Sequence, residues 1–170
     1  MTIYSYYHGI MDLLELISSE LCFCNVDAPS KKRVINYIAD YVNDQYPALD
    51  REAIYSGLIQ REKLGSTGIG LGIGIPHCRV DICHKMIGVA IKLVQPIDFD
   101  SIDGTPVDFI FALIVPQESS QDHLDALSQI AELFNGEDAL RNIRACNTKK
   151  ELYDTLIDSI QQHFGTENPV

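Results

Sequence analysis

The sequence predicts a layered α/β domain, in which helices cover the faces of a β-sheet. Two apolar stretches, KMIGVAIKLV at 85–94 and PVDFIFALIV at 106–115, are typical of strands, and the second is apolar enough for a central one. Segments with apolar residues at helical spacing lie before and after these strands. Helices that flank strands along the chain bury their apolar stripes against a sheet, which favours the α/β class.

Two helices are predicted before the strands. Ser30 can cap a helix that begins at Lys31, in which apolar residues recur at helical spacing up to Pro47. Asp50 can cap a second helix that ends near Gly65, a residue type that favours the position just after a helix. Between the two strands, residues 96–105 carry the aspartates and glycine that are common in turns.

Three helices are predicted after the strands. Ser119 or Ser120 can cap a long helix that ends at Asn135-Gly136, and a short helix follows at 137–145. The spacing predicts that the long helix buries Leu124, Leu127, Ile130, Ala131 and Phe134. The last helix begins after a capping box, in which a threonine is followed three residues later by a glutamate (Thr148 and Glu151).

Composition excludes several classes of function. The formal net charge of −11 at pH 7 argues against binding to nucleic acids and against docking on anionic membranes. No apolar run is long enough for a membrane span, and the N-terminal residues lack the features of a signal peptide. Five cysteines, an odd number in a 170-residue chain, are expected to be reduced thiols in a cytoplasmic, single-domain protein.

Residues 65–79, GSTGIGLGIGIPHCR, hold five glycines within ten positions. They fit neither the dinucleotide-binding fingerprint nor the P-loop, because Leu71-Gly72 stands where a P-loop has lysine and a hydroxyl residue. One interpretation is a loop that merely turns tightly. The other is a loop whose N–H groups approach an anion without a Cβ in the way. On the second interpretation, the candidate phosphate-binding residues are Ser66, Thr67 and Gly68.

His77 ends this stretch and is the candidate nucleophile. Pro76 restricts the backbone before it, Arg79 follows it, and Arg61 lies at the end of the preceding predicted helix. A histidine near glycine amides and arginines suits a phosphoryl carrier, since imidazole is nucleophilic near neutral pH and arginine binds phosphoryl oxygens. A purely structural histidine is the alternative. His123, in the first turn of the long helix, is either a surface residue or a second imidazole that binds the phosphoryl group.

The cysteines offer a competing interpretation, a zinc or thiol sensor. His77-Cys78 and Cys83-His84 form an HC-x4-CH arrangement. Adjacent residues of a strand point to opposite faces, and no zinc-finger spacing fits, so we predict no metal site. Cys22-x-Cys24 is not a C-x-x-C redox pair and is expected to place one thiol inside and one outside.

Residues 61–79, REKLGSTGIGLGIGIPHCR, resemble the signature of IIA domains of the bacterial phosphoenolpyruvate:sugar phosphotransferase system, fructose/mannitol type, and are most like its nitrogen-regulatory branch. SKKRVINYIADYV, PIDFDSIDGTPVDFIFALIVP, the helix of His123 and KKELYDTL are similar to the family as well. The resemblance covers about residues 10–164, and it implies a mixed sheet between helix layers.

The resemblance also implies roles for individual residues. His77 would accept a phosphoryl group from HPr or its nitrogen-branch counterpart, and Arg61 and His123 would bind the phosphoryl oxygens or orient His77. No cofactor is implied. One departure stands out, because Cys78 occupies a position where the family usually has glycine. Cysteine there would be strained if the backbone required a positive φ, and its thiol could be oxidised.

Two outcomes of phosphorylation stay open. In the nitrogen-regulatory interpretation, the phosphorylation state decides which regulatory targets, such as kinase or transporter subunits, the protein binds. In the alternative, the phosphoryl group passes to a separate IIB domain for uptake of a fructose- or mannitol-type sugar. The sequence leaves the oligomeric state open, a homo-oligomer included.

Overall fold

The computed structural model describes residues 13–118 and 121–165. The strands are β1 (Cys22–Val26), β2 (Gly68–Gly70), β3 (Ile73–Gly74), β4 (His77–Val80), β5 (Ile87–Ile97) and β6 (Val107–Pro116). The helices are η1 (Ser19–Leu21), α2 (Lys31–Gln45), α3 (Arg51–Lys63), α4 (Gln121–Phe134), α5 (Glu137–Ala145) and α6 (Lys149–Phe164), and residues 13–16 are helical too.

The strands form one mixed sheet in the order β1-β5-β6-β3-β2, with β4 also paired to β6. β1 runs parallel to β5, whereas β5 and β6 are antiparallel. β3 and β4 both run parallel to β6, one after the other along its length. The long central pair of the sheet is therefore the pair of strands that the apolar stretches predicted, and the mixed sheet is confirmed.

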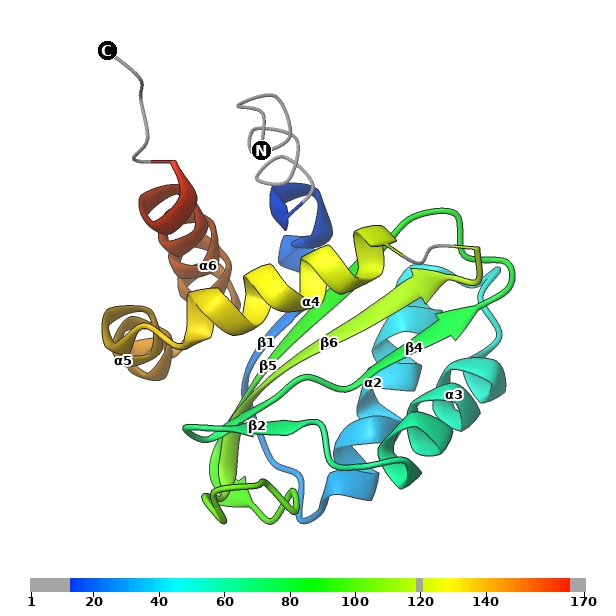
Figure 1. The fold of residues 1–170 in the computed structure, drawn as a ribbon, viewed down its shortest axis with the longest axis horizontal. Coiled ribbons are helices and arrows are strands. Elements are labelled where there is room, and N and C mark those ends of the chain that lie inside the picture. Colours follow the sequence, from blue (N-terminus) through cyan, green and yellow to red (C-terminus); the bar gives the residue numbers. More distant parts are fainter. Residues whose placement is uncertain (1–12, 119–120, 166–170) are drawn as a thin grey trace.

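Helices cover both faces of the sheet (Figure 1). The helices α2 and α3 pack on one face, where Ile38 and Ile54 meet strand residues such as Ile114. On the other face α4, α5 and α6 form a second core, with Ile130 and Leu156 among its buried residues. The predicted sandwich of a sheet between helix layers is confirmed.

The predicted helix starts are confirmed where the structure describes them. The side chain of Ser30 accepts the N–H of Arg33, and Asp50 does the same for Ala53. Thr148 and Glu151 form the reciprocal capping box, and the short helix spans the predicted Glu137–Ala145. Ser119 and Ser120, the candidate caps of the long helix, lie outside the described residues.

The buried face of α4 differs from the prediction. Leu124 is exposed, and Leu127 and Ala131 are only partly buried. The buried residues of the helix are His123, Ala126, Ile130, Leu133 and Phe134. The inward face starts one residue earlier than expected because the first turn packs His123 against the ring of His77. A histidine therefore takes the place that an apolar pattern assigned to a leucine.

Four short strands were not predicted. Three of them, β2, β3 and β4, lie in or directly after the glycine-rich stretch, which carries little apolar alternation. The fourth, β1, carries the Cys22-x-Cys24 pair, and its first thiol is buried while the second is half-buried. These strands pair with the sheet at its edges, so their formation depends on distant partners more than on local pattern.

Candidate functional site

His77 is the first residue of β4, which lies at an open edge of the sheet. β4 pairs with β6 in parallel register, His77 opposite Leu113, and the described residues place no strand on its other side. Just before it, the carbonyl of Pro76 accepts the N–H of Leu113 at 2.9 Å. Side chains alternate along the strand, so Cys78 enters the core under α2 and α3 while His77 faces α4.

Both ring nitrogens of His77 have partners. Nδ1 lies 2.9 Å from the carbonyl oxygen of Ile75, and Nε of Arg61 lies 3.1 Å from Nε2. A carbonyl can only accept and a guanidinium can only donate. Nδ1 therefore carries the proton, and Nε2 presents its lone pair.

The surroundings keep His77 uncharged. Burial lowers the pKa of His77 below its ordinary value of 6.5, and the positive charge of Arg61 lowers it further. The hydrogen bond to Ile75 and the carboxylate of Glu62 act in the opposite direction without reversing the result. At neutral pH the ring is thus a neutral imidazole with a directed lone pair, the form that can act as a nucleophile.

Arg61 reaches this ring from the last turn of α3. Its Nη1 donates to the carbonyl of Gly65 at 3.0 Å, so the guanidinium is anchored to the loop that follows its own helix. Arg79 lies two residues beyond His77 and is exposed, with Nη1 donating to the carbonyl of Gln117 at 3.3 Å. Two arginines thus place positive charge on the His77 side of β4.

His123 lies against His77, with ring centroids 5.4 Å apart and the planes at 65°. It is 7% exposed, and among the described residues neither of its ring nitrogens has a hydrogen-bond partner. Burial lowers the pKa of His123, and the electrostatic effects of the neighbouring His77 ring and of the Arg79 guanidinium lower it further. None of the described side chains or backbone groups therefore fixes the orientation of this ring by a hydrogen bond. The structure thus brings together His77, Arg61 and His123.

The loop candidates Ser66, Thr67 and Gly68 are held by the protein itself. The hydroxyl of Ser66 donates to the carbonyl of Phe99 at 2.6 Å and accepts the N–H of Gly68 at 3.0 Å. The hydroxyl of Thr67 donates to Glu62 at 2.6 Å. These contacts shape the loop that leads to His77, and phosphate binding by the three residues remains a prediction.

Sequence reasoning did not single out Glu62 as a site residue. Its side chain is 8% exposed and accepts hydrogen bonds from both the N–H and the hydroxyl of Thr67. A carboxylate placed directly after Arg61 and five residues before Thr67 was the signal available in the sequence. Its partners are evident only in the structure, where the loop folds back onto the end of α3.

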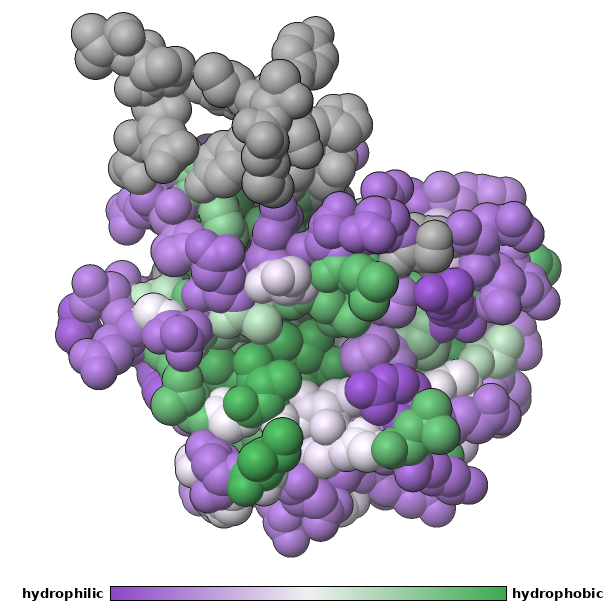
Figure 2. Space-filling model, viewed as in Figure 1, coloured by the Kyte–Doolittle hydropathy of each residue, from purple (hydrophilic) through white to green (hydrophobic). Residues whose placement is uncertain are grey.

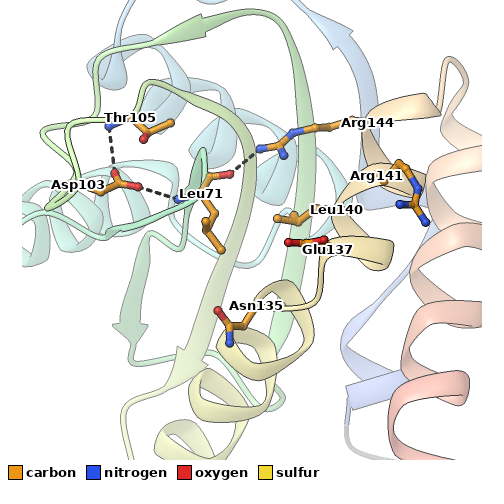
Figure 3. A pocket seen from close by; sticks show the side chains of 8 residues that line it. All are labelled: Leu71, Asp103, Thr105, Asn135, Glu137, Leu140, Arg141 and Arg144. Carbon is orange, nitrogen blue, oxygen red and sulfur yellow. Dashed lines mark hydrogen bonds between the residues drawn. The ribbon is translucent and has the colours of Figure 1, made fainter.

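The tip of the glycine stretch is held from two sides (Figure 3). Asp103 accepts the N–H of Leu71 at 3.0 Å, and Arg144 of α5 donates to its carbonyl at 2.5 Å. Three consecutive residues have positive φ here, and a Cβ on Gly72 would lie 2.6 Å from a nitrogen of Arg144. The cavity beside this tip, about 600 Å³, is lined by Arg141 and Arg144 among others and is separate from His77.

Some exposed apolar side chains belong to the elements that carry the site or lead to it. Figure 2 shows green areas on the face that carries α4 and the glycine-rich strands. Leu64, Ile69, Leu71 and Leu124 are exposed and belong to the end of α3, the glycine-rich stretch and α4. Exposed apolar areas are typical of surfaces that receive a protein partner.

Cys78 does not disturb the site, contrary to both concerns raised by the sequence. The described non-glycine residues with positive φ are Asn25, Leu71 and Asp100, so Cys78 has an ordinary strand backbone. Its side chain fills the space beside Gly57 of α3, where an added Cβ would lie 3.0 Å from that of Cys78. Burial raises the pKa of the Cys78 thiol to about 12, which makes it unreactive.

The structure gives the zinc or thiol interpretation no support. His77 and Cys78 point to opposite sides of β4, as the strand geometry predicted. Within residues 13–118 and 121–165, no three histidine, cysteine or acidic side chains are grouped closely enough to hold a metal ion. Burial also raises the pKa of Cys22 to about 12 and that of Cys24 and Cys83.

These features define a class of α/β domain that presents an uncharged histidine, an arginine and a second histidine at an open sheet edge. Residues 15–159 match the family described as "Phosphoenolpyruvate-dependent sugar phosphotransferase system, EIIA 2". The chain therefore belongs to this EIIA family, as its resemblance predicted. Membership supports a phosphotransferase role.

Relatives place the chain in the nitrogen-regulatory branch. It is 40% identical over 146 residues to the "Nitrogen regulatory protein" of Pseudomonas aeruginosa, covering 86% of this chain and 95% of the relative. The crystal structure of the nitrogen regulatory protein IIA-Ntr from Neisseria meningitidis matches with a TM-score of 0.78 at 30% identity, covering 85% of this chain and 98% of that one. The resemblance to this branch is confirmed.

A more distant structure shares the fold alone. The mannitol enzyme IIA of Escherichia coli, solved in complex with phosphorylated enzyme IIB, matches with a TM-score of 0.69 at 15% identity, over 84% of this chain and 97% of that one. Among the described helices of the present chain, none has the length and apolar character needed to cross a membrane.

Proposed function

We propose that this chain is a cytoplasmic phosphoryl carrier of the nitrogen-regulatory type. It accepts a phosphoryl group on Nε2 of His77 from the phosphohistidine of HPr or of an HPr-like carrier. It then binds regulatory protein targets according to its phosphorylation state. The observation that carries the proposal is the neutral His77, whose Nδ1 is held by Ile75 and whose Nε2 faces Arg61.

The step is an exchange of one P–N bond for another. The lone pair on Nε2 of His77 attacks phosphorus while the P–N bond of the donor phosphohistidine breaks, and the donor imidazole keeps that electron pair. The proton on Nδ1 of His77 stays in place, so the phosphorylated ring carries a positive charge beside the carbonyl of Ile75. Donor and product are both phosphohistidines, so the transfer is reversible.

Arg61 and His123 can bind the transferred phosphoryl group. The Arg61 N–H that now donates to Nε2 points to the place where phosphorus arrives, so the guanidinium can bind the phosphoryl oxygens. His123, neutral and with no described partner, can donate one N–H to the same oxygens. Both groups stabilise negative charge as the transition state spreads it over three oxygens.

Phosphorylation would change the surface that a partner meets. The transferred group carries about −1.5 to −2 charges at neutral pH, and the positive charge on the phosphorylated ring offsets one of them. These charges arise on a ring that contacts Arg61 and His123, and the residue after His123, Leu124, is exposed. A target that docks on this surface would therefore distinguish the two states.

Onward transfer to a IIB domain is the second candidate, favoured by the fold shared with a mannitol enzyme IIA that binds phosphorylated IIB.

The first experiment is phosphorylation with phosphoenolpyruvate, enzyme I and either HPr or its nitrogen-branch counterpart, followed by intact mass and peptide mapping. One acid-labile phosphoryl group on His77 is expected, and none in His77→Ala. His84→Ala is the matched control, since His84 is an exposed histidine beyond the end of β4. Full labelling of His77→Ala would refute the assignment. Transfer from the labelled protein to a purified IIB domain would favour the second candidate.

A further inference from the structure

We propose that Glu62 is a positioning residue that fixes which ring nitrogen of His77 is free to react. It acts through Thr67 and Ile75, and Lys31 holds it in place. The inference rests on the proposed function, because it explains how the reactive form of His77 is selected.

Glu62 makes two contacts with the start of the glycine stretch and one with α2. Oε1 accepts the backbone N–H of Thr67 at 2.9 Å, and Oε2 accepts its hydroxyl at 2.6 Å. The ammonium of Lys31 lies 3.1 Å from Oε1. The Glu62 side chain is 8% exposed and that of Lys31 19%. A buried carboxylate with these partners keeps one geometry, since every alternative leaves a buried charge or donor unpaired.

A chain of hydrogen bonds runs from this carboxylate to the histidine ring. The carbonyl of Thr67 accepts the N–H of Ile75 at 2.9 Å, and the carbonyl of Ile75 accepts Nδ1–H of His77 at 2.9 Å. Fixing Thr67 therefore holds the backbone at Ile75 in place, and the carbonyl of the same residue meets the ring. That carbonyl decides which ring nitrogen carries the proton.

The end of α3 thus controls both sides of the ring. Arg61 donates directly to Nε2, and its neighbour Glu62 acts on Nδ1 through Thr67 and Ile75. The two effects agree, because a proton on Nδ1 leaves Nε2 as the acceptor that Arg61 needs.

A second loop closes over these contacts. Lys31 also pairs with Asp100 at 2.9 Å and lies 5.0 Å from the ring centroid of Phe99. The carbonyl of Phe99 accepts the hydroxyl of Ser66, next to Thr67. The ion pair is thus enclosed by loop 98–103, which shields it from solvent and favours a single arrangement.

Glu62→Ala and Glu62→Gln separate the contributions of geometry and charge. Alanine leaves the N–H and hydroxyl of Thr67 without their acceptor, whereas glutamine can still accept the N–H but loses the charge that faces Lys31. Asp40→Asn is the matched control. Asp40 pairs with Arg51 at 2.6 Å and joins the same two helices, α2 and α3, without a contact to the glycine stretch.

Two measurements test the proposal. Nitrogen-15 NMR of the imidazole reports the tautomer of His77 in the unphosphorylated full chain. Initial rates of phosphorylation at varied carrier concentration separate the maximal rate from the half-saturating concentration. For Glu62→Ala we expect mixed tautomers and a maximal rate roughly tenfold lower or more, as for other groups that orient a histidine from behind. The half-saturating concentration should change little. Glu62→Gln should lie between Glu62→Ala and the wild type, and Asp40→Asn should match the wild type.

A pure Nδ1–H tautomer and a wild-type rate in Glu62→Ala would overturn the proposal, as would an equal loss of rate in Asp40→Asn. If circular dichroism shows that Glu62→Ala does not fold, Glu62→Gln and Thr67→Val are measured in its place, and wild-type values in both would overturn it. The NMR readout needs no phosphocarrier. A wild-type protein that is never phosphorylated would therefore refute the proposed function and leave the tautomer test intact.

Discussion

The two histidines that meet at the open edge of the sheet are held in opposite ways. His77, on an edge strand, has Nδ1 bound to the carbonyl of Ile75 and Nε2 bound to Arg61. His123, in the first turn of α4, has two buried ring nitrogens with no described partner. Burial lowers the pKa of both, so neither ring is charged at neutral pH. The two rings therefore differ in their hydrogen-bond partners, which orient His77 but not His123, and not in their charge.

Under the proposed function, this contrast separates the nucleophile, His77, from the residue that binds the transferred group, His123. A nucleophile needs one defined lone pair, and the two partners of His77 supply that definition. A group that binds a charge which appears only after transfer needs a donor that the protein does not already use, and the neutral ring of His123 has one N–H with no described partner.

The largest effect short of removing His77 is expected from Arg61→Ala. Loss of the guanidinium removes the cation nearest to the phosphoryl oxygens and should slow phosphorylation by roughly 10³-fold. The pKa of His77 should rise, because the charge of Arg61 lowers it. Rapid-quench rates and an NMR titration measure the two effects.

Lys63→Ala is the matched control for this experiment. Lys63 lies in the same last turn of α3 and is exposed. A wild-type rate in Arg61→Ala would remove Arg61 from the site. An unchanged His77 titration would show that the contact with Nε2 does not set the charge state of the ring.

A smaller effect is expected from His123→Ala, roughly a 10²-fold loss of rate for one donor to the transferred group. Because the histidine leaves two buried nitrogens unpaired, thermal stability should fall less than for a histidine with partners. His123→Gln should recover part of the rate, since its amide can donate from a similar place. Rates and melting temperatures measured together test both statements.

A large loss of stability with little loss of rate in His123→Ala would favour the structural interpretation of this histidine. The contrast between the two rings would then concern packing rather than chemistry. His163→Ala serves as the control, because His163 pairs with Glu132 far along the chain and away from His77.

Local signals predicted much of the fold. The caps at Ser30, Asp50 and Thr148 act within four residues, so a short stretch of sequence contains all that decides them. The strands β5 and β6 were recognisable because nearly continuous apolar runs are typical of a sheet covered on both faces. The short strand β1 was not recognisable in the sequence, since its pairing with β5 depends on residues more than sixty positions away.

The site was predictable in its residue types more than in its contacts. Arg61, His77 and His123 were chosen from spacing and resemblance, and the structure brings them together. The role of Glu62 depends on how a loop folds back on the end of its helix, which no periodicity encodes. For the same reason, the sequence did not predict the protein partners of the hydroxyl group that was chosen for phosphate binding, such as the carbonyl of Phe99 that Ser66 contacts.

The smallest effect is expected on stability as pH falls. Unfolded histidines titrate near 6.5, whereas the pKa values of His77 and His123 are lowered in the folded state. Above pH 6.5 both states hold these rings neutral, so the two histidines add no pH dependence there. Below it the unfolded chain binds protons that the folded chain does not, and the free energy of unfolding decreases towards the folded pKa values.

Urea unfolding at pH 7.5, 6.5 and 5.5 measures this decrease, and the variant carrying both His77→Ala and His123→Ala should show less of it. Carboxylates titrate in both proteins and cancel in the difference. Each single variant then shows how much one ring contributes. Equal slopes in wild type and double variant would mean that the rings accept protons as readily folded as unfolded. The conclusion that both rings are neutral in the folded protein, on which the contrast between the two histidines depends, would then be wrong.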